Sequence, residues 1–231
     1  MTVNLNYTRH LPHLAPEGSP IFVTWNLKGA MPVAAIAELK KKREALETQP
    51  PRPGETSAER SVRENKILFA AADQFLDQAV EGPMHLKDPR AARIVEDAIL
   101  FGVGERYELF AWRVMSNHVH IMIKPGWRGA ESIQSQAGKP DLRNWDLPRV
   151  MKGLKGYTAH QINEVLDSRG HVFWQDESYD HWARDEDEML RIIQYIEKNP
   201  TKARQCLRPE DWPWSSARFR GDWRPGEAFE K

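Results

Sequence analysis

Two histidines lie one residue apart in the stretch SNHVHIMIKP, residues 116–125. Alternate residues of a β-strand point to the same face, so His118 and His120 would project together while the apolar residues between and after them project to the other side. Two imidazoles placed in this way can bind one divalent metal, although further ligands must come from elsewhere in the chain. The alternative is a pair of histidines that bind no metal and make hydrogen bonds to other side chains or to solvent. The apolar neighbours argue against this alternative, because they indicate burial, and a half-buried imidazole pair without a partner costs folding free energy.

The elements that must position this pair follow from local patterns. Strands are predicted where β-branched and aromatic residues gather, and the short turn at Ser116 and Asn117 makes two of these strands antiparallel neighbours. Helices are predicted where helix formers follow capping residues, and we expect Pro200 to stop the last of them. The predicted strands are 20–27, 106–115, 118–125 and a short edge strand at 178–183, and the predicted helices are 86–102, 147–166 and 184–199. This order indicates an α+β fold with helices covering one face of a small antiparallel sheet.

A separate helical region interrupts this pattern. Residues 33–47 and 58–80 are rich in helix formers, and TQPPRPGETS at 48–57 breaks them apart. We expect 33–80 to form a helical hairpin inserted within a single domain that spans 1–231.

The composition limits the class of protein. Lysine plus arginine and aspartate plus glutamate are both 33, so the net charge gives no overall case for nucleic acid, and a basic groove has to be local. A single cysteine excludes an internal disulfide and fits a reducing cytosol. Neither a membrane span nor a signal peptide is evident. We therefore expect a soluble cytoplasmic protein with no membrane partner.

The residues around the histidine pair resemble a known family. VMSNHVHIMIKP resembles the His-hydrophobic-His motif of the HUH single-tyrosine transposases. FWQDESYDHWARDEDEMLRIIQYIEKNP (173–200) and RPEDWPWSSA (208–217) resemble the C-terminal half of the REP-associated tyrosine transposases, and RHLPHLAPEGSPIFVTWNL resembles their opening strand. The resemblance covers most of the chain outside 33–80, in the same order. It implies a ferredoxin-like antiparallel sheet with helices on one face, plus the helical insertion.

The resemblance also implies a mechanism. In such enzymes a tyrosine hydroxyl attacks a phosphodiester of single-stranded DNA and leaves a 5′-phosphotyrosine and a 3′-hydroxyl, while a metal orients the phosphate. Of the five tyrosines, the family motif selects Tyr195 in QYIEKNP. Asn199 lies four residues on, hence on the same helical face, and would be the third metal ligand beside His118 and His120. An amide oxygen suits Mg²⁺ or Mn²⁺, and imidazole favours Mn²⁺.

Each of these assignments has a plainer alternative. Tyr195 is surrounded by isoleucines and could be a core aromatic. Asn199 precedes a proline, where asparagine commonly ends a helix. Tyr157, in a basic context, is the second candidate nucleophile, although an aromatic on the helix surface near DNA suits it better.

Basic residues provide the candidate DNA contacts. Arg149, Lys152 and Lys155 lie on one predicted helix, and Lys124 and Arg128 follow the histidine strand. Such a cluster is usually only a solvated face. Because it adjoins the predicted site in the sequence, we interpret it as the wall of a groove that contacts phosphates. Four tryptophans could stack on unpaired bases, although the core is the commoner place for any one of them: Trp174, Trp182, Trp212 and Trp214.

Together these features predict a transposase-like endonuclease that cleaves single-stranded DNA next to hairpins through a phosphotyrosine, acting as a monomer or homodimer. A domesticated, non-cleaving protein that binds repetitive palindromes is the first alternative. A metal-dependent hydrolase of a small phosphoester is the second, and the scarcity of acidic residues near the pair disfavours it.

Overall fold

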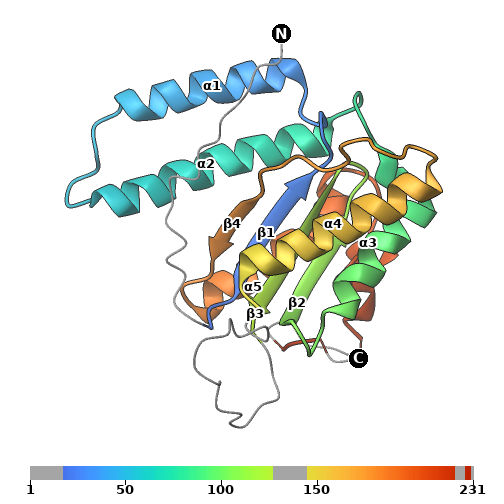
Figure 1. Ribbon diagram of the computed structural model, residues 1–231. Coiled ribbons are helices and arrows are strands. Elements are labelled where there is room, and N and C mark those ends of the chain that lie inside the picture. The colour runs from blue at the N-terminus through green and yellow to red at the C-terminus, as the bar shows by residue number, and fades with distance from the viewer. Residues whose placement is uncertain (1–17, 127–144, 222–226, 230–231) are drawn as a thin grey trace, which may run out of the picture. The chain divides into compact units, whose positions relative to one another are not determined.

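The computed structural model describes residues 18–126, 145–221 and 227–229 (Figure 1). The chain forms two compact units, one made chiefly by Gly29–Pro83 and the other by Ala15–Lys28 together with Met84–Lys231. That residues 1–231 act as a single domain with 33–80 inserted stays a prediction. Within the described ranges, no helix combines the length and the apolar character needed to cross a membrane.

The first unit is a helical hairpin, as the sequence indicated. Helix α1 (Val33–Thr48) and helix α2 (Ser57–Gln78) pack against each other. The Thr56 side chain caps α2 by accepting a hydrogen bond from the backbone N–H of Glu59. The Glu59 carboxylate in turn accepts the backbone N–H of Thr56. Arg60 donates to the carbonyls of Leu46 and Glu47 in the last turn of α1, and the Leu46 carbonyl also accepts from the backbone N–H of Gln49. Side chains at the start of α2 therefore fix the connection between the two helices.

The second unit is built on a four-stranded antiparallel sheet. Its strands are β1 (Ile21–Asn26), β2 (Tyr107–Val114), β3 (His118–Pro125) and β4 (Tyr179–Trp182), in the order β2-β3-β1-β4. The hairpin and then helix α3 (Pro89–Phe101) lie between β1 and β2 in the chain, and helix α4 (Leu147–Val165) lies between β3 and β4, so without the hairpin the arrangement is ferredoxin-like. The predicted α+β class is confirmed.

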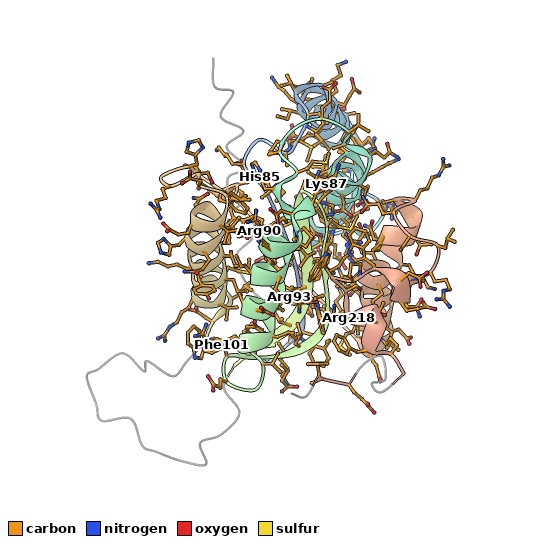
Figure 2. All side chains as sticks on the ribbon, turned by 90° about the vertical axis from the view of Figure 1, so that its right-hand side faces the viewer. His85, Lys87, Arg90, Arg93, Phe101 and Arg218 are labelled. Atoms are coloured by element: carbon orange, nitrogen blue, oxygen red, sulfur yellow. The ribbon has the colours of Figure 1, made fainter. Side chains whose placement is uncertain are left out.

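Two helices cover the apolar face of this sheet. Helix α3 (Pro89–Phe101) and helix α4 (Leu147–Val165) pack side by side, and the short 3-10 helix η1 (His85–Lys87) precedes α3. Trp112 of β2 donates its indole N–H to Glu96 of α3 at 2.9 Å. In Figure 2 the labels from His85 to Phe101 follow η1 and α3, and α4 lies beside α3 on the same side of the sheet. The helices expected on one face are therefore these two.

The third helix lies across the opposite face and differs from its prediction. Helix α5 (Glu186–Lys202) was expected to stop at Pro200, but it continues through the proline to Lys202. It packs against β2 and β3. Two short 3-10 helices, η2 (Pro209–Asp211) and η3 (Ser216–Phe219), follow it. Ser216 and Arg220 both bond to the buried Glu197, so the C-terminal segment is attached to α5.

Candidate active site

The histidines project together from β3, on the face that α5 covers. His118 and His120 are fully buried, and their ring centroids are 4.8 Å apart with the ring planes nearly perpendicular, at 86°. Ile121, the residue after His120, is directly opposite Trp112 in β2. Because Trp112 bonds to Glu96 of α3, Ile121 lies on the α3 side of the sheet. The alternation of the strand thus brings the two imidazoles together, as its sequence indicated.

His120 is oriented by its neighbour on β1. Thr24 lies directly opposite it in the register of the two strands, and the Thr24 hydroxyl is 2.6 Å from Nδ1 of His120. The ring of Phe22 stacks on the imidazole at a centroid distance of 5.5 Å and an angle of 9°. With Nδ1 engaged by an oxygen, Nε2 is the nitrogen with which His120 would bind a metal, in the arrangement common for metal-binding histidines.

His118 has a partner at each ring nitrogen. Its Nδ1 is 2.7 Å from the amide oxygen of Asn117, and its Nε2 is 3.2 Å from Nη2 of Arg113. A guanidinium can only donate hydrogen bonds, so Nε2 accepts and the ring proton lies on Nδ1, which donates to Asn117. Arg113 is fully buried, and its Nη1 donates to the carbonyl of Ile196 in α5 at 3.1 Å. Sequence reasoning missed Arg113, because its position in an apolar strand gave no sign of its partners.

Tyr195 lies beside this pair. Its ring is half-buried on α5, with its centroid 6.0 Å from that of His120 and 6.1 Å from that of Phe22. The ammonium of Lys202, two turns further along α5, lies 5.3 Å from the centroid of the Tyr195 ring. The predicted nucleophile and the predicted metal ligands therefore meet on one face of the sheet.

The other described tyrosines differ in their surroundings. Tyr157 is 57% exposed on α4, across the sheet from the histidines. Tyr107 donates its hydroxyl to the carbonyl of Ile99, and burial raises the pKa of Tyr107 well above its ordinary value. Tyr179, which sequence reasoning did not select, lies on β4 with its ring centroid 6.1 Å from that of Phe22. Among the described residues, Tyr179 is therefore the tyrosine that most needs to be tested against Tyr195.

Asn199 is buried one turn after Tyr195 on α5. It does not end the helix, because its carbonyl accepts the N–H of Ala203. Its role as the third metal ligand stays a prediction.

The start of α5 is held by residues of the predicted motif. Asp185 caps the helix by accepting the backbone N–H of Glu188 at 2.6 Å. The carboxylate of Glu188 in turn bonds to Nε2 of His181 at 3.0 Å and to the backbone N–H of Arg184. These contacts attach β4 to the helix that carries Tyr195.

The donor set suits a divalent metal, with one condition. Both imidazoles have Nδ1 engaged by an oxygen, which fixes their orientation. Nε2 of His118, however, accepts from Arg113, so a metal can bind there only when Nη2 of Arg113 releases that nitrogen.

The basic residues predicted to contact DNA are in different situations. Lys152 is exposed on α4. Lys155 donates its ammonium to the carbonyls of Gln175 and Asp176 at 2.6 and 2.8 Å. Lys124 pairs with Glu108 at 3.6 Å, and Arg128 lies outside the described residues. Because α4 covers the face opposite the histidines, the basic residues of α4 do not line the same face of the sheet as Tyr195.

Arg149 belongs to a cluster that sequence reasoning missed. Its guanidinium lies 4.5 Å from the centroid of the Trp145 ring, and that of Arg106 lies 4.6 Å from the same ring. Arg106 also lies 4.9 Å from the ring of Phe101, which is 58% exposed. Arg106 precedes β2 and Trp145 precedes α4, so only the fold brings them together. Of the four tryptophans singled out from the sequence, Trp174 is buried and donates to Thr158, as the alternative of a core position required.

Comparisons with known proteins give a match among the solved structures. No family model matches the sequence, and no curated protein does either. A solved structure of a REP-associated tyrosine transposase bound to a REP hairpin is similar in fold, with a TM-score of 0.51 and 14% sequence identity. The match covers 96% of this chain and 98% of that chain. The fold is therefore similar to that of this solved transposase over nearly the whole length of both chains.

Proposed function

We propose that this chain is a DNA strand-transfer endonuclease that cleaves single-stranded DNA next to hairpins. The observation that carries the proposal is the position of Tyr195, whose ring centroid is 6.0 Å from that of His120 on the face where both histidines project. A hydroxyl nucleophile beside two imidazoles that could hold a metal is a combination capable of phosphodiester transfer to tyrosine. The similar fold of a transposase bound to a REP hairpin supports the same function.

The reaction assigns a role to each side chain. The hydroxyl of Tyr195 attacks phosphorus, the bond from phosphorus to the 3′ oxygen breaks, and the 5′-phosphotyrosine keeps the energy needed to rejoin a strand. His118, His120 and Asn199 would hold Mg²⁺ or Mn²⁺, which supplies positive charge at the scissile phosphate. Lys202 places a second positive charge beside the tyrosine ring, where it can contact the same phosphate.

The cluster of Arg106, Trp145 and Arg149 is the best candidate for binding the DNA outside the active site. Its two guanidinium groups lie within 4.6 Å of one indole centroid, so positive charge and an aromatic surface coincide. Such pairs contact phosphates and stack on unpaired bases, whatever the sequence of the strand. A local cluster of this kind explains how a chain of zero net charge binds a polyanion. Hairpin DNA would then reach from this cluster to Tyr195 round an edge of the sheet, on one protomer or on a homodimer.

The test is covalent capture of the DNA. A hairpin oligonucleotide with a labelled single-stranded flank is incubated with Mn²⁺, and the denatured protein is analysed for an adduct and its site by mass spectrometry. Wild type should form an adduct at Tyr195. Tyr195→Phe removes one oxygen, keeps the ring packing, and should bind the DNA without forming the adduct. Tyr179→Phe, which removes the hydroxyl of the other tyrosine near Phe22, and Tyr157→Phe on α4 are the matched controls. An adduct that persists in Tyr195→Phe and disappears in Tyr179→Phe would assign the nucleophile to β4.

A non-cleaving binder of hairpin DNA is the second candidate, and one observation favours it. Nη2 of Arg113 lies 3.2 Å from the nitrogen of His118 that a metal would need. If wild type binds the hairpin but forms no adduct with either metal, the binder becomes the better assignment.

A further inference from the structure

Helix α5 contains a carbonyl that its own backbone cannot satisfy. In an α-helix each carbonyl accepts from the N–H four residues later, and the residue four positions after Ile196 is Pro200, which has no N–H. The helix nevertheless continues to Lys202. A donor from outside the helix can therefore take the place of the missing N–H.

Arg113 supplies that donor from β2. Its Nη1 donates to the carbonyl of Ile196 at 3.1 Å, while Nη2 donates to Nε2 of His118 at 3.2 Å. The guanidinium is rigid and planar, so the two bonds fix the distance between the carbonyl and the imidazole. Ile196 is the residue directly after Tyr195. One buried side chain thus links the helix of the proposed nucleophile to the proposed metal ligand.

We propose that Arg113 is a positioning residue that holds Tyr195 in register with His118 through the carbonyl that Pro200 leaves without a helical donor. The link itself rests on hydrogen bonds of the folded chain, and its catalytic consequence rests on the proposed function. A buried guanidinium is costly to desolvate, and an apolar side chain would fill the same space at a lower cost. The buried Arg113 is therefore explained by the position it gives to Tyr195 and His118, rather than by its packing.

The link has a second consequence for the metal. Nε2 of His118 can face either the guanidinium or a metal ion, and the guanidinium also repels a divalent cation. Arg113→Met removes the competitor and keeps a long unbranched side chain. It should therefore strengthen Mn²⁺ binding while it slows attack by Tyr195. A merely disturbed fold would weaken both properties together.

The experiment is a double-mutant cycle between Arg113→Met and Pro200→Ala, measured as the single-turnover rate of adduct formation. In the protein that retains Pro200, Arg113→Met should slow adduct formation by about 100-fold. This is the size of effect expected when a reacting group is displaced by about 1 Å. In the Pro200→Ala protein the restored N–H satisfies Ile196, so the same change should slow the rate by about 10-fold or less. The affinity for the hairpin should be the same in all four proteins. Arg113→Lys should recover little of the rate, since one ammonium cannot reproduce the two-pronged contact.

Two readouts without DNA separate this proposal from the proposed function. The ¹⁵N NMR spectrum of the imidazoles should place the proton of His118 on Nδ1 in wild type, and the Nε2 resonance should move in Arg113→Met. Calorimetric titration with Mn²⁺ should show tighter binding in that variant. If these two results hold while wild type forms no adduct, the endonuclease assignment fails and the link stands. An equal loss of rate in both members of the cycle, or an unchanged Nε2 resonance, would overturn the link.

Discussion

Thr24→Val tests whether the hydrogen bond at His120 prepares a metal ligand. Valine has nearly the shape of threonine but no hydroxyl, so the substitution removes the 2.6 Å contact with Nδ1 and leaves the strand packing in place. Thr24 is 5% exposed and His120 is fully buried, so water cannot easily replace the lost partner. The buried nitrogen is then left without the oxygen that orients its ring.

The structure sets the size of two separate effects. Leaving a buried polar group unsatisfied costs about 1–3 kcal/mol. For a chain of this size that lowers Tm by about 2–12 °C, at roughly 2–4 °C for each kcal/mol. Loss of the partner that orients a metal-binding histidine weakens metal affinity by about 10–100-fold. The second effect is specific to a metal site, whereas the first accompanies any buried hydrogen bond.

Thr158→Val is the matched control. The Thr158 hydroxyl is 2% exposed, accepts from Trp174 at 2.9 Å and donates to the carbonyl of Leu154, all on the α4 side of the sheet. Thermal unfolding should show comparable losses in both variants, and Mn²⁺ titration should show weakened binding in Thr24→Val alone. A Thr24→Val protein with a lowered Tm and wild-type Mn²⁺ affinity would refute the role of His120 as a ligand oriented by Thr24.

Two further predictions concern DNA binding and pH. Lys152→Ala should weaken hairpin binding and reduce its salt dependence by up to about 0.7 slope units for the lost phosphate contact, whereas Lys155→Ala should chiefly lower Tm, because Lys155 holds two carbonyls. For Asp88, hydrogen bonds from the side chain and backbone of Arg90 lower the pKa from 3.8 to about 2, so its stabilisation of α3 is present above about pH 4 and is lost as the pH falls towards 2. Asp88→Asn should therefore have a lower Tm than wild type at pH 6, and the difference should shrink towards pH 2. A constant difference across that range would show that the charge of Asp88 is not responsible.

Much of the fold could be predicted because its signals are local. The alternation of β3, the cap at Asp88 with Pro89 behind it, and the spacing between Tyr195 and Asn199 each involve a few neighbouring residues. Those signals were sufficient to place the elements to within a few residues. They were also sufficient to put the two histidines on one face.

What could not be predicted depends on contacts between distant residues. The rule that proline ends a helix considers only the donors of the helix itself. It was wrong at Pro200, where Arg113, far away in sequence, donates to the affected carbonyl. Trp145 likewise gave no signal, since Arg106 reaches it only after β2 and α4 are in place. The sequence gives the chemical type of each side chain, but which distant residue it contacts depends on the fold.

The polar network beneath the histidines bears on the choice between an endonuclease and a binder. Arg113 and His118 are fully buried, Asn117 and Thr24 nearly so, and each contributes a hydrogen bond that an apolar residue would not need. Replacing such a buried network with well-packed apolar residues is often neutral or stabilising. A protein that only held DNA on its exposed basic residues would gain nothing from a fixed imidazole tautomer or from a helix tied to it. An enzyme gains a nucleophile whose position is set to a fraction of an ångström. The network as a whole therefore supports chemistry at Tyr195, although its bond between Arg113 and His118 must open before a metal can bind at Nε2.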